Sequence, residues 1–439
     1  MVAPSLCIIC KGANLCGRRT CPLLAALRRR EAGIRLKKEF FGPSISVFVG
    51  RVGYPRVRVG PVATVEEFQQ ATLLEDTKGL FGLELEDILE LRSLTLRANK
   101  SESVFSKKRF VSDLQEIALA SKPVDVELNF TKEPSFRMRF SDLLQPVGAT
   151  APLEKLKVVE NPKIPRAVEK VVSDDLKATE AVSELYAAGL DVHKISTILA
   201  SGALGAESPK SRKKLVPTRW SITATDDIVF KHLIRDVRKC PQVNEFRVYE
   251  ACYMDNHFVI LLRPSAFEYE NFEAWAPGSS WYPADEFEVE VEGSGNEAKF
   301  MSATKAADVA DTDVTQMRRK AKSLILREYE GFKGRKNYAA QEGGGYYAAR
   351  LAVAEFLHNI RRQASVVVFR EVHEGYVLPL GVWVVRETAR RAFERKPQVF
   401  ESEKEALEYV DSRLRLGLKP FAEKSLVLGQ KRLNCFLPS

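Results

Sequence analysis

Four cysteines fall within fifteen residues near the start of the chain, and their spacing constrains the local fold more strongly than any other feature. They are Cys7, Cys10, Cys16 and Cys21, in a C-x2-C-x5-C-x4-C pattern. Two thiolates separated by two residues can bind one ion from a tight turn, and nearby glycines allow the second pair to complete a tetrahedron. Because so small a loop cannot bury a core, the ion would supply its folding energy. We expect a structural Zn2+; an iron–sulfur cluster and a pair of disulfides are the alternatives.

The first 40 residues are also strongly basic. They hold nine Lys and Arg against two Glu, whereas the whole chain has a net charge of +9. A clustered cationic segment favours a polyanionic partner through counterion release, so we expect contact with DNA here. A solvated basic tail and an anionic membrane surface are the alternatives, although no amphipathic apolar face accompanies the charges. The residues that we expect to contact phosphate are Arg18, Arg19, Arg28 and Arg29.

Length and hydropathy set the broad class of the protein. A chain of 439 residues that is 45% hydrophobic is long enough for two or three packed domains. No stretch approaches the roughly 18 consecutive apolar residues that span a bilayer, and the first ten residues lack the pattern of a signal peptide. We therefore expect a cytoplasmic protein that associates with the nucleoid and has no membrane partner.

Strand-like and helical segments alternate along the chain, which predicts an α+β fold. Residues 40–63 combine β-branched and aromatic residues with Gly and Pro turns, which is typical of short strands. Residues 83–99 carry apolar residues at helical spacing and predict a helix, whereas the apolar run at 375–387 predicts a strand.

A stretch of small and polar residues at 293–312 predicts a domain boundary. We expect a zinc-binding basic module at 1–36, a domain of mixed strands and helices at 37–295, a smaller α+β domain at 313–424 and a flexible tail at 425–439. Within the larger domain, residues 173–205 predict a helical hairpin around Gly189. This is the outline of a helix-turn-helix that could read DNA, and a hairpin packed in the core is the commoner alternative.

A second basic segment lies in the middle of the chain. Residues 208–219 carry five basic side chains, including Lys213 and Lys214, and no acid. They run toward Asp226 and Asp227, a carboxylate pair that, with Arg219, could hold a divalent metal or act as acid and base. A solvated loop followed by an Asp at a helix N-cap is the alternative.

Three glycines, Gly343, Gly344 and Gly345, precede a segment of helical periodicity. Exposed backbone N–H groups at such a helix start bind anions, and Arg350 could assist. The motif is weak, because no Walker Lys-Ser/Thr follows it, and a turn with a purely conformational role is the alternative.

The last residues carry two large apolar side chains in an otherwise polar segment. Gln430, Leu433, Phe436 and Leu437 stand at positions i, i+3, i+6 and i+7, and one turn of 3₁₀-helix would gather the apolar members on one side. The pattern matches the Q-x-x-apolar-x-x-aromatic-aromatic box that docks in an apolar pocket of the DNA sliding clamp. Leu437 departs from the usual second ring. A tail folded onto its own domain is the alternative.

Several stretches together resemble one family. SVFVGRVGYPRVRVGP, LRSLTLR, NPKIPRAVEKVVSDDLKA, KLVPTRWSITATDD and GGGYYAARLAV, behind the four cysteines and before the clamp box, are similar to the archaeal Nre DNA repair proteins. The resemblance implies a two-part Nre architecture, a role in the repair of DNA damage and contact with the archaeal clamp, PCNA. It supplies no reaction and no catalytic residue. We therefore expect a DNA repair factor, with a metal-dependent nuclease, glycosylase or nucleotide-processing enzyme, or a zinc-bearing DNA-binding regulator, as alternatives.

Overall fold

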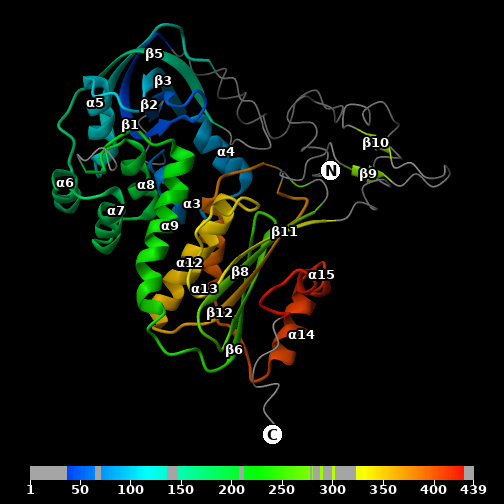
Figure 1. Cartoon of the computed structure of the whole chain (residues 1–439). Coiled ribbons are helices and arrows are strands. Elements are labelled where there is room, and N and C mark those ends of the chain that lie inside the picture. The colour runs from blue at the N-terminus through cyan, green and yellow to red at the C-terminus, as the bar shows by residue number, and fades with distance from the viewer. Residues whose placement is uncertain are drawn as a thin grey trace. The chain divides into compact units, whose positions relative to one another are not determined.

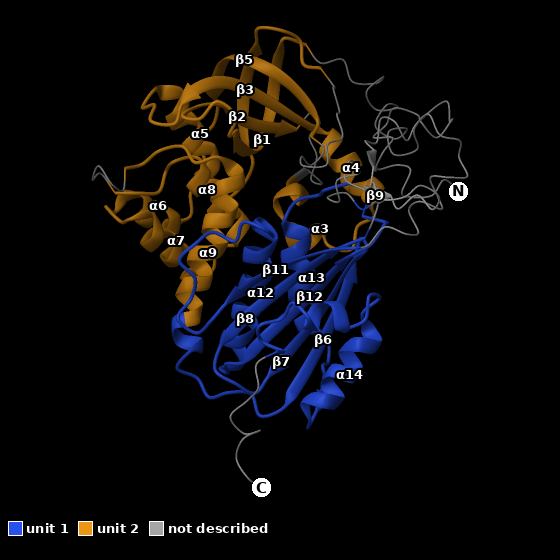
Figure 2. Cartoon of the chain, turned by 45° about the vertical axis from the view of Figure 1, so that its right-hand side comes forward, with its two compact units in different colours: residues 1–21, 140–145, 235–439 blue, residues 22–139, 146–234 orange. Residues whose placement is uncertain are grey.

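The computed structural model describes residues 37–64, 71–135, 147–206, 212–276, 279, 287–289, 299–301, 323–376 and 378–429. Among these residues the chain forms two compact units that divide between Ile234 and Arg235 (Figures 1 and 2). We call them the barrel unit and the sheet unit. Both combine helices and strands, as an α+β fold requires. None of the described helices combines the length and the apolar character that a membrane span requires.

A closed five-stranded barrel forms the centre of the barrel unit, with the strand order β1-β2-β3-β5-β4. β3 pairs in parallel with β5, while the other neighbours are antiparallel and β1 closes onto β4. Helix α5 (Arg109–Leu119) connects β3 to β4. A small five-stranded barrel is the architecture of OB folds. The strands are β1 (Glu39–Val49), β2 (Arg56–Thr64), β3 (Thr95–Ser103), β4 (Val124–Phe130) and β5 (Ala149–Val158).

The barrel forms because its strands alternate apolar and polar residues. In β2, Val57 and Val59 are buried in the core, whereas Arg56 and Arg58 are exposed. Successive side chains on a strand point to opposite faces, so this alternation puts the arginines outside. β2 and β3 approach closely at Gly60, where a Cβ atom would lie 1.9 Å from the carbonyl oxygen of Ala98. Glycine is therefore required at this point.

Helices surround the barrel, and one of them ends earlier than the sequence suggests. The helix predicted over residues 83–99 ends at Ser93, and the chain enters β3 at Thr95. Leu96 and Ala98 point into the barrel core, and pairing of β3 with two neighbours outweighs the local helical spacing. The remaining elements are η1 (Ala71–Glu75), α3 (Thr77–Leu80), α4 (Leu85–Ser93), α6 (Arg166–Ser173), α7 (Ala178–Ala187), α8 (Val192–Ala200) and α9 (Thr218–Val237).

The sheet unit contains a six-stranded sheet in the order β11-β8-β12-β7-β6-β13. β12 is parallel to β8, and the other pairs are antiparallel. The sheet takes strands from both sides of the boundary predicted at 293–312. Its strands are β6 (Phe246–Tyr253), β7 (Asn256–Arg263), β8 (Glu268–Trp275), β11 (Leu324–Glu330), β12 (Ser365–Val372) and β13 (Gln398–Phe400), and β9 (Phe287–Val289) pairs separately with β10 (Lys299–Met301).

Helices cover both faces of this sheet (Figure 1). α12 (Gly344–Ile360) and α13 (Trp383–Glu394) lie on one face, and α14 (Glu403–Arg413) and α15 (Lys419–Ala422) lie on the other. The strand predicted over 375–387 is wrong, because the run from Trp383 onward belongs to α13. A short apolar run does not distinguish a buried strand from a buried helix, and here it packs against α12, β6 and β7.

The face of the sheet beneath α12 carries a layer of buried polar groups. Arg350 of α12 is fully buried and pairs with Glu330 of β11, which also accepts a hydrogen bond from Tyr346 at 3.1 Å. Arg370 of β12 donates to Glu273 of β8 at 2.6 Å. Pairing offsets part of the cost of removing these charges from water, and loss of one partner would leave the other charge buried and uncompensated.

We expect Glu330→Gln to destabilise the protein by about 3–5 kcal/mol, because it removes the negative charge that the buried guanidinium of Arg350 faces. Denaturant unfolding would measure the change. Glu394→Gln is the matched control, since Glu394 pairs with Arg391 at 2.7 Å but lies exposed, and it should cost less than about 0.5 kcal/mol. Equal effects of the two substitutions would contradict a buried ion pair that matters for stability.

Candidate nucleic-acid interface

Two groups of predicted site residues lie outside the described residues. The first comprises the four cysteines, Cys7, Cys10, Cys16 and Cys21, with Arg18, Arg19, Arg28 and Arg29. The second is the predicted clamp box, Gln430, Leu433, Phe436 and Leu437. Their metal-binding, DNA-binding and clamp-binding roles therefore stay predictions.

Asp226 and Asp227 lie in the middle of α9, not at a helix N-cap. Neighbouring residues on a helix point about 100° apart, so the two carboxylates do not face each other. Asp226 is buried, whereas Asp227 pairs with Lys231 one turn later at 2.6 Å. No group of three or more His, Cys, Asp or Glu in the described part of the chain could hold a metal ion. This geometry gives no support to a catalytic centre with Arg219.

The three glycines stand at the start of a long helix, α12: Gly343 is its N-cap, and Gly344 and Gly345 are its first residues. The start of this helix faces an acid. A Cβ atom on Gly345 would lie 2.2 Å from the Glu273 carboxylate oxygen. Burial and the nearby Glu273 also raise the pKa of Glu342 well above its ordinary value. Arg350, predicted to assist phosphate binding, is buried against Glu330. Its guanidinium cannot reach a phosphate in solvent while it keeps this partner, and the Glu273 carboxylate at the helix start disfavours an anion there.

The predicted helical hairpin consists of α7 and α8, with Gly189 in the left-handed region at φ 88°. α8 would be the DNA-reading helix, but none of its residues is exposed. It packs against β1 and α5 of the barrel. The hairpin is therefore part of the core of its unit, and a helix with no exposed residue cannot read base edges in a groove.

The segment that precedes α9 is fixed to one end of the barrel. Leu215 donates a backbone hydrogen bond to Val104, which in turn donates to Pro55, each at 2.9 Å. Val49 of β1 donates to the Thr218 hydroxyl, also at 2.9 Å. Three segments that are distant in the sequence thus meet: the turn between β1 and β2, the segment after β3, and residues 212–220.

These segments bring basic residues together without acids. Residues 50–58, 103–109 and 212–220 contain ten Lys and Arg and no Asp or Glu. We call them the basic surface. Arg56 and Arg58 point outward from β2 opposite Ser103 and Ser101 of β3. The other exposed cations are Arg51, Lys107, Lys108, Arg109, Arg212, Lys214 and Arg219.

Two of the predicted phosphate contacts differ in their surroundings. Lys214 is exposed and lies over the ring of Phe105, with its Nζ atom 5.8 Å from the ring centroid. Lys213 is half-buried and donates to the carbonyl oxygen of Val172 at 2.9 Å. Lys213 therefore anchors the segment to the end of α6, and Lys214 is the better placed of the two to meet a phosphate.

An acid beside the basic surface is already neutralised. Glu102 is buried and pairs with Lys108 at 3.2 Å. Burial alone would raise the pKa of this carboxyl, but hydrogen bonds from Ser103 and Lys108 outweigh it and lower the pKa. Glu102 stays ionised and takes up part of the charge of Lys108, and Asp113 of α5 does the same for Arg109 at 3.1 Å. The other cations determine the potential of the surface.

Sequence reasoning identified the basic residues at 208–219 but missed those in the β1–β2 region. The alternation in RVRV could have revealed Arg56 and Arg58, because a strand that buries its valines must expose its arginines. Sequence reasoning also missed Tyr54 and Phe105 as exposed rings. Nothing in the local sequence shows that the three segments meet, since their hydrogen bonds join residues more than 40 positions apart.

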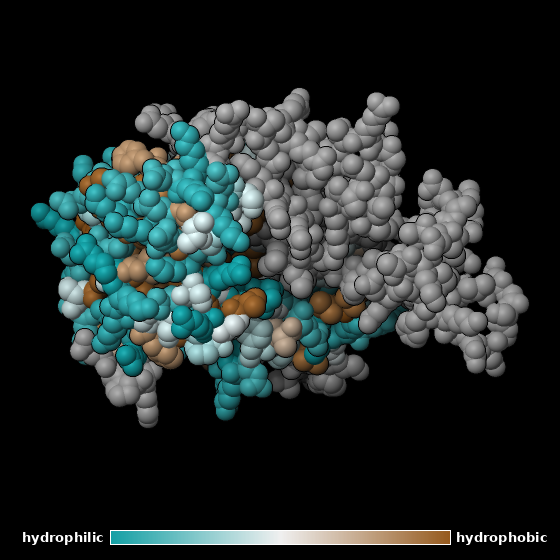
Figure 3. Space-filling view, turned by 90° about the horizontal axis from the view of Figure 1, so that it is seen from above, coloured by the Kyte–Doolittle hydropathy of each residue, from teal (hydrophilic) through white to brown (hydrophobic). Residues whose placement is uncertain are grey.

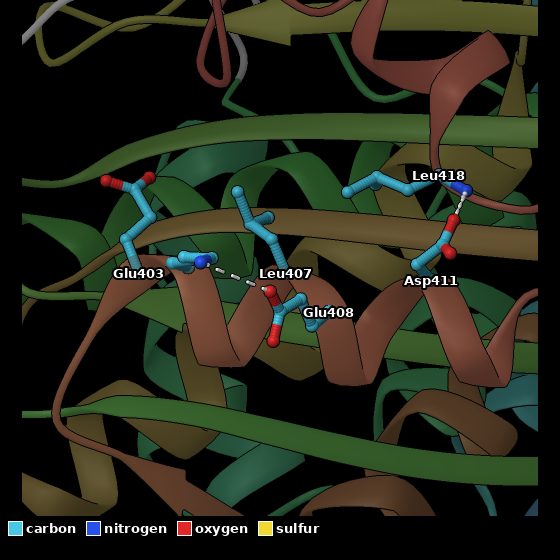
Figure 4. A pocket seen from close by; sticks show the side chains of 6 residues that line it. Glu403, Leu407, Glu408, Asp411 and Leu418 are labelled. Carbon is cyan, nitrogen blue, oxygen red and sulfur yellow. Dashed lines mark hydrogen bonds and ion pairs between the residues drawn. The ribbon is translucent and has the colours of Figure 1, made fainter.

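The structure also contains a surface groove of about 490 Å³ along α14 (Figure 4). Its polar groups have partners: Glu403 pairs with the buried Arg263, Lys404 lies 3.8 Å from Glu408, and Asp411 accepts from the Leu418 amide at 2.6 Å. It is lined by several carboxylates and has no cluster of cations. Such a groove does not suit a nucleic acid.

The face of the molecule shown in Figure 3 is mainly hydrophilic over the described residues, with apolar residues scattered between them.

Known proteins resemble this chain over nearly its whole length. Residues 15–282 match the family described as "Archaeal Nre, N-terminal", and residues 330–436 match "Archaeal Nre, C-terminal". The DNA repair protein NreB of Archaeoglobus fulgidus is 37% identical over 430 residues, which cover 97% of each chain. The DNA repair protein NreA of the same organism is 38% identical over 91% of this chain and 92% of its own.

A third relative, the DNA repair protein NreA of Haloferax volcanii, is 32% identical over 90% of this chain and 87% of its own. No solved structure matches. The N-terminal match alone spans more than half of the chain, which confirms the resemblance inferred from the five sequence stretches. The protein belongs to the archaeal Nre family.

Proposed function

We propose that this protein is a DNA repair factor that binds DNA phosphates through its basic surface and is recruited by the sliding clamp PCNA. The main support for the DNA contact is that three segments of the barrel unit lie together and contain ten basic side chains and no acid. The relatives NreA and NreB, each named a DNA repair protein, support the biological role.

The physical basis of the DNA contact is charge. Lys and Arg that neutralise phosphates release condensed counterions, so binding weakens as salt rises. Acids would cancel part of this gain. The three segments contain none, although Glu102 and Asp113 beside them pair with Lys108 and Arg109. The contact would be independent of sequence, because phosphates carry no base information. Such binding suits a repair factor that must act at many sites.

Replacing Lys107 and Lys214 by Ala should weaken DNA binding and lower its salt dependence. We expect the slope of log Kobs against log[salt] to fall by about 0.7–0.9 for each phosphate that the variant no longer neutralises. Fluorescence anisotropy with a labelled oligonucleotide at several salt concentrations would measure it. Lys404→Ala with Lys419→Ala is the matched control, since both lysines are exposed in the sheet unit. An unchanged slope would remove the basic surface from the proposal.

The clamp contact is proposed from residue pattern alone. Gln430, Leu433, Phe436 and Leu437 supply a hydrogen-bonding side chain and three apolar side chains at the spacing of a clamp-binding box. An apolar anchor that enters a pocket contributes most of the binding energy of such short peptides. The resemblance to the Nre family pointed to the same partner.

Phe436→Ala and Leu433→Ala should each weaken binding to archaeal PCNA by about tenfold or more, because truncation of a buried anchor costs about 2 kcal/mol or more. Isothermal titration with purified clamp would measure this. Lys431→Ala and Asn434→Ala, outside the box positions, should have little effect. Clamp affinity that survives both box substitutions would refute docking through this segment.

The four cysteines are proposed to hold one structural Zn2+. Thiolates are the ligands that suit zinc in a closed tetrahedral site, and a site with four protein ligands leaves no open position for catalysis. The bound ion would hold the arginines of the same segment, including Arg18 and Arg19, in a fixed arrangement near DNA.

Purified protein should contain one zinc per chain by atomic emission, and Cys7→Ser with Cys10→Ser should lose it. Cys252→Ser is the control, because this cysteine is a free, exposed thiol of the sheet unit. Iron and labile sulfide in place of zinc would indicate a cluster. Metal content unaffected by the paired substitution would show that these cysteines do not bind it.

A further inference from the structure

Three exposed aromatic rings lie within the basic surface. Tyr54 is 41% exposed, Phe105 44% and Trp220 45%. Burying an aromatic ring is strongly favourable, so three rings left open on one surface call for a partner. Their place among cations restricts what that partner can be.

The rings are held by the same contacts that assemble the surface. Tyr54 lies in the β1–β2 turn and meets Trp220, the third residue of α9, with ring centroids 5.2 Å apart and planes tilted by 52°. Because the rings are tilted, they are not stacked face to face on each other. Phe105 follows Val104, whose amide donates to Pro55, the neighbour of Tyr54. A ring contact thus links Tyr54 to Trp220, and a backbone hydrogen bond between neighbouring residues links Tyr54 to Phe105.

Cations accompany each ring. The guanidinium of Arg212 and the ammonium of Lys214 both lie 5.8 Å from the centroid of Phe105. Arg51 lies in the same turn as Tyr54, and Arg219 precedes Trp220. A partner that covers the rings must therefore also satisfy several positive charges. This combination disfavours an apolar protein segment and favours a polyanion with flat apolar groups.

Single-stranded nucleic acid has this chemistry. Its unstacked bases offer faces to aromatic side chains, while its phosphates meet basic residues along a groove or strand. In a duplex the bases stack on one another and cannot lie on a protein ring. The position of the basic surface on the barrel also suits an oligonucleotide. OB barrels bind oligonucleotides on the face formed by strands 2 and 3 and at the loop between strands 1 and 2. Here Arg56 and Arg58 occupy that face and Tyr54 that loop.

We propose that the surface formed by Tyr54, Phe105, Trp220 and the surrounding cations binds single-stranded DNA by base stacking. The inference rests on the proposed DNA-binding function and names the form of DNA that the barrel unit takes. Phosphate contacts from the basic residues supply affinity that depends on salt, and the rings supply the preference for unpaired bases. The binding has no strong sequence preference, because every base has a face that can stack.

The test compares full-length protein and variants by fluorescence anisotropy on three labelled probes: a dT20 oligonucleotide, a 20-base-pair duplex and rU20. The wild-type protein should bind dT20 more tightly than the duplex. Tyr54→Ala, Phe105→Ala and Trp220→Ala should each weaken dT20 binding by about tenfold, the scale of one stacked base. The salt slope should stay unchanged, because the cations that meet the phosphates are all retained.

Phe332→Ala is the matched control. Phe332 is 48% exposed in the sheet unit and also lies beside a guanidinium, that of Arg238, at 5.4 Å. The Phe332→Ala variant should bind dT20 as tightly as the wild-type protein. Trp220→Phe and Tyr54→Phe keep a ring and should recover most of the affinity that the Ala variants lack. Thermal unfolding is measured for every variant to confirm that it stays folded at the assay temperature, since more than half of each ring is buried.

The outcomes separate the two proposals. Two results together would overturn the inference and leave the DNA-binding function in place. The variant with Lys107→Ala and Lys214→Ala would lose duplex binding, and the three Ala substitutions of the rings would leave dT20 binding unchanged. Tighter binding of rU20 than of dT20 would overturn it in favour of RNA. Failure to bind any of the three probes would refute both.

Discussion

Closure of the five-stranded barrel is the constraint on which the proposed DNA surface depends. β1 pairs with β4, and β3 pairs with β5, so no strand of the barrel keeps a free edge. Closure decides which side of β2 is inside: Val57 and Val59 fill the core, and Arg56 and Arg58 must face outward. The same strands end where the β1–β2 turn, the segment after β3 and residues 212–220 exchange hydrogen bonds. The rings and cations of the surface are therefore held by a rigid scaffold.

The chain uses its basic residues in two physically different ways. In the sheet unit, Arg350 and Arg370 are buried and paired with Glu330 and Glu273. A buried charge without a partner costs several kcal/mol, so these arginines are committed to the fold. On the barrel unit, the three basic segments contain no acid of their own, and nine of their ten basic residues are exposed to solvent. Only the second group can pair with DNA phosphates, although the residues of both groups contribute to the net charge of +9.

The proposals assign different tasks to different parts of the chain. The barrel surface would bind unpaired DNA, the predicted zinc module would add basic contacts, and the predicted box would bring the protein to PCNA. Single-stranded stretches are exposed wherever DNA is copied or damaged, so a clamp-recruited factor with affinity for them would meet its substrate at the same place. No step in this scheme requires the protein to break or form a covalent bond.

The sequence by itself determined the family, the α+β class and the strands at 40–63, because each rests on local composition, turn residues or direct similarity. It also located the long helix that begins at the three glycines, with Gly343 as its N-cap. It failed where tertiary contacts overrode local periodicity: Leu96 and Ala98 joined a barrel strand, and the run from Trp383 joined a helix. Only the tertiary structure decided that Arg350 is buried, that Asp226 and Asp227 diverge on a helix, and that Tyr54, Phe105 and Trp220 share a surface. These facts depend on contacts between residues distant in the sequence, and no local pattern encodes which distant segment will supply the partner.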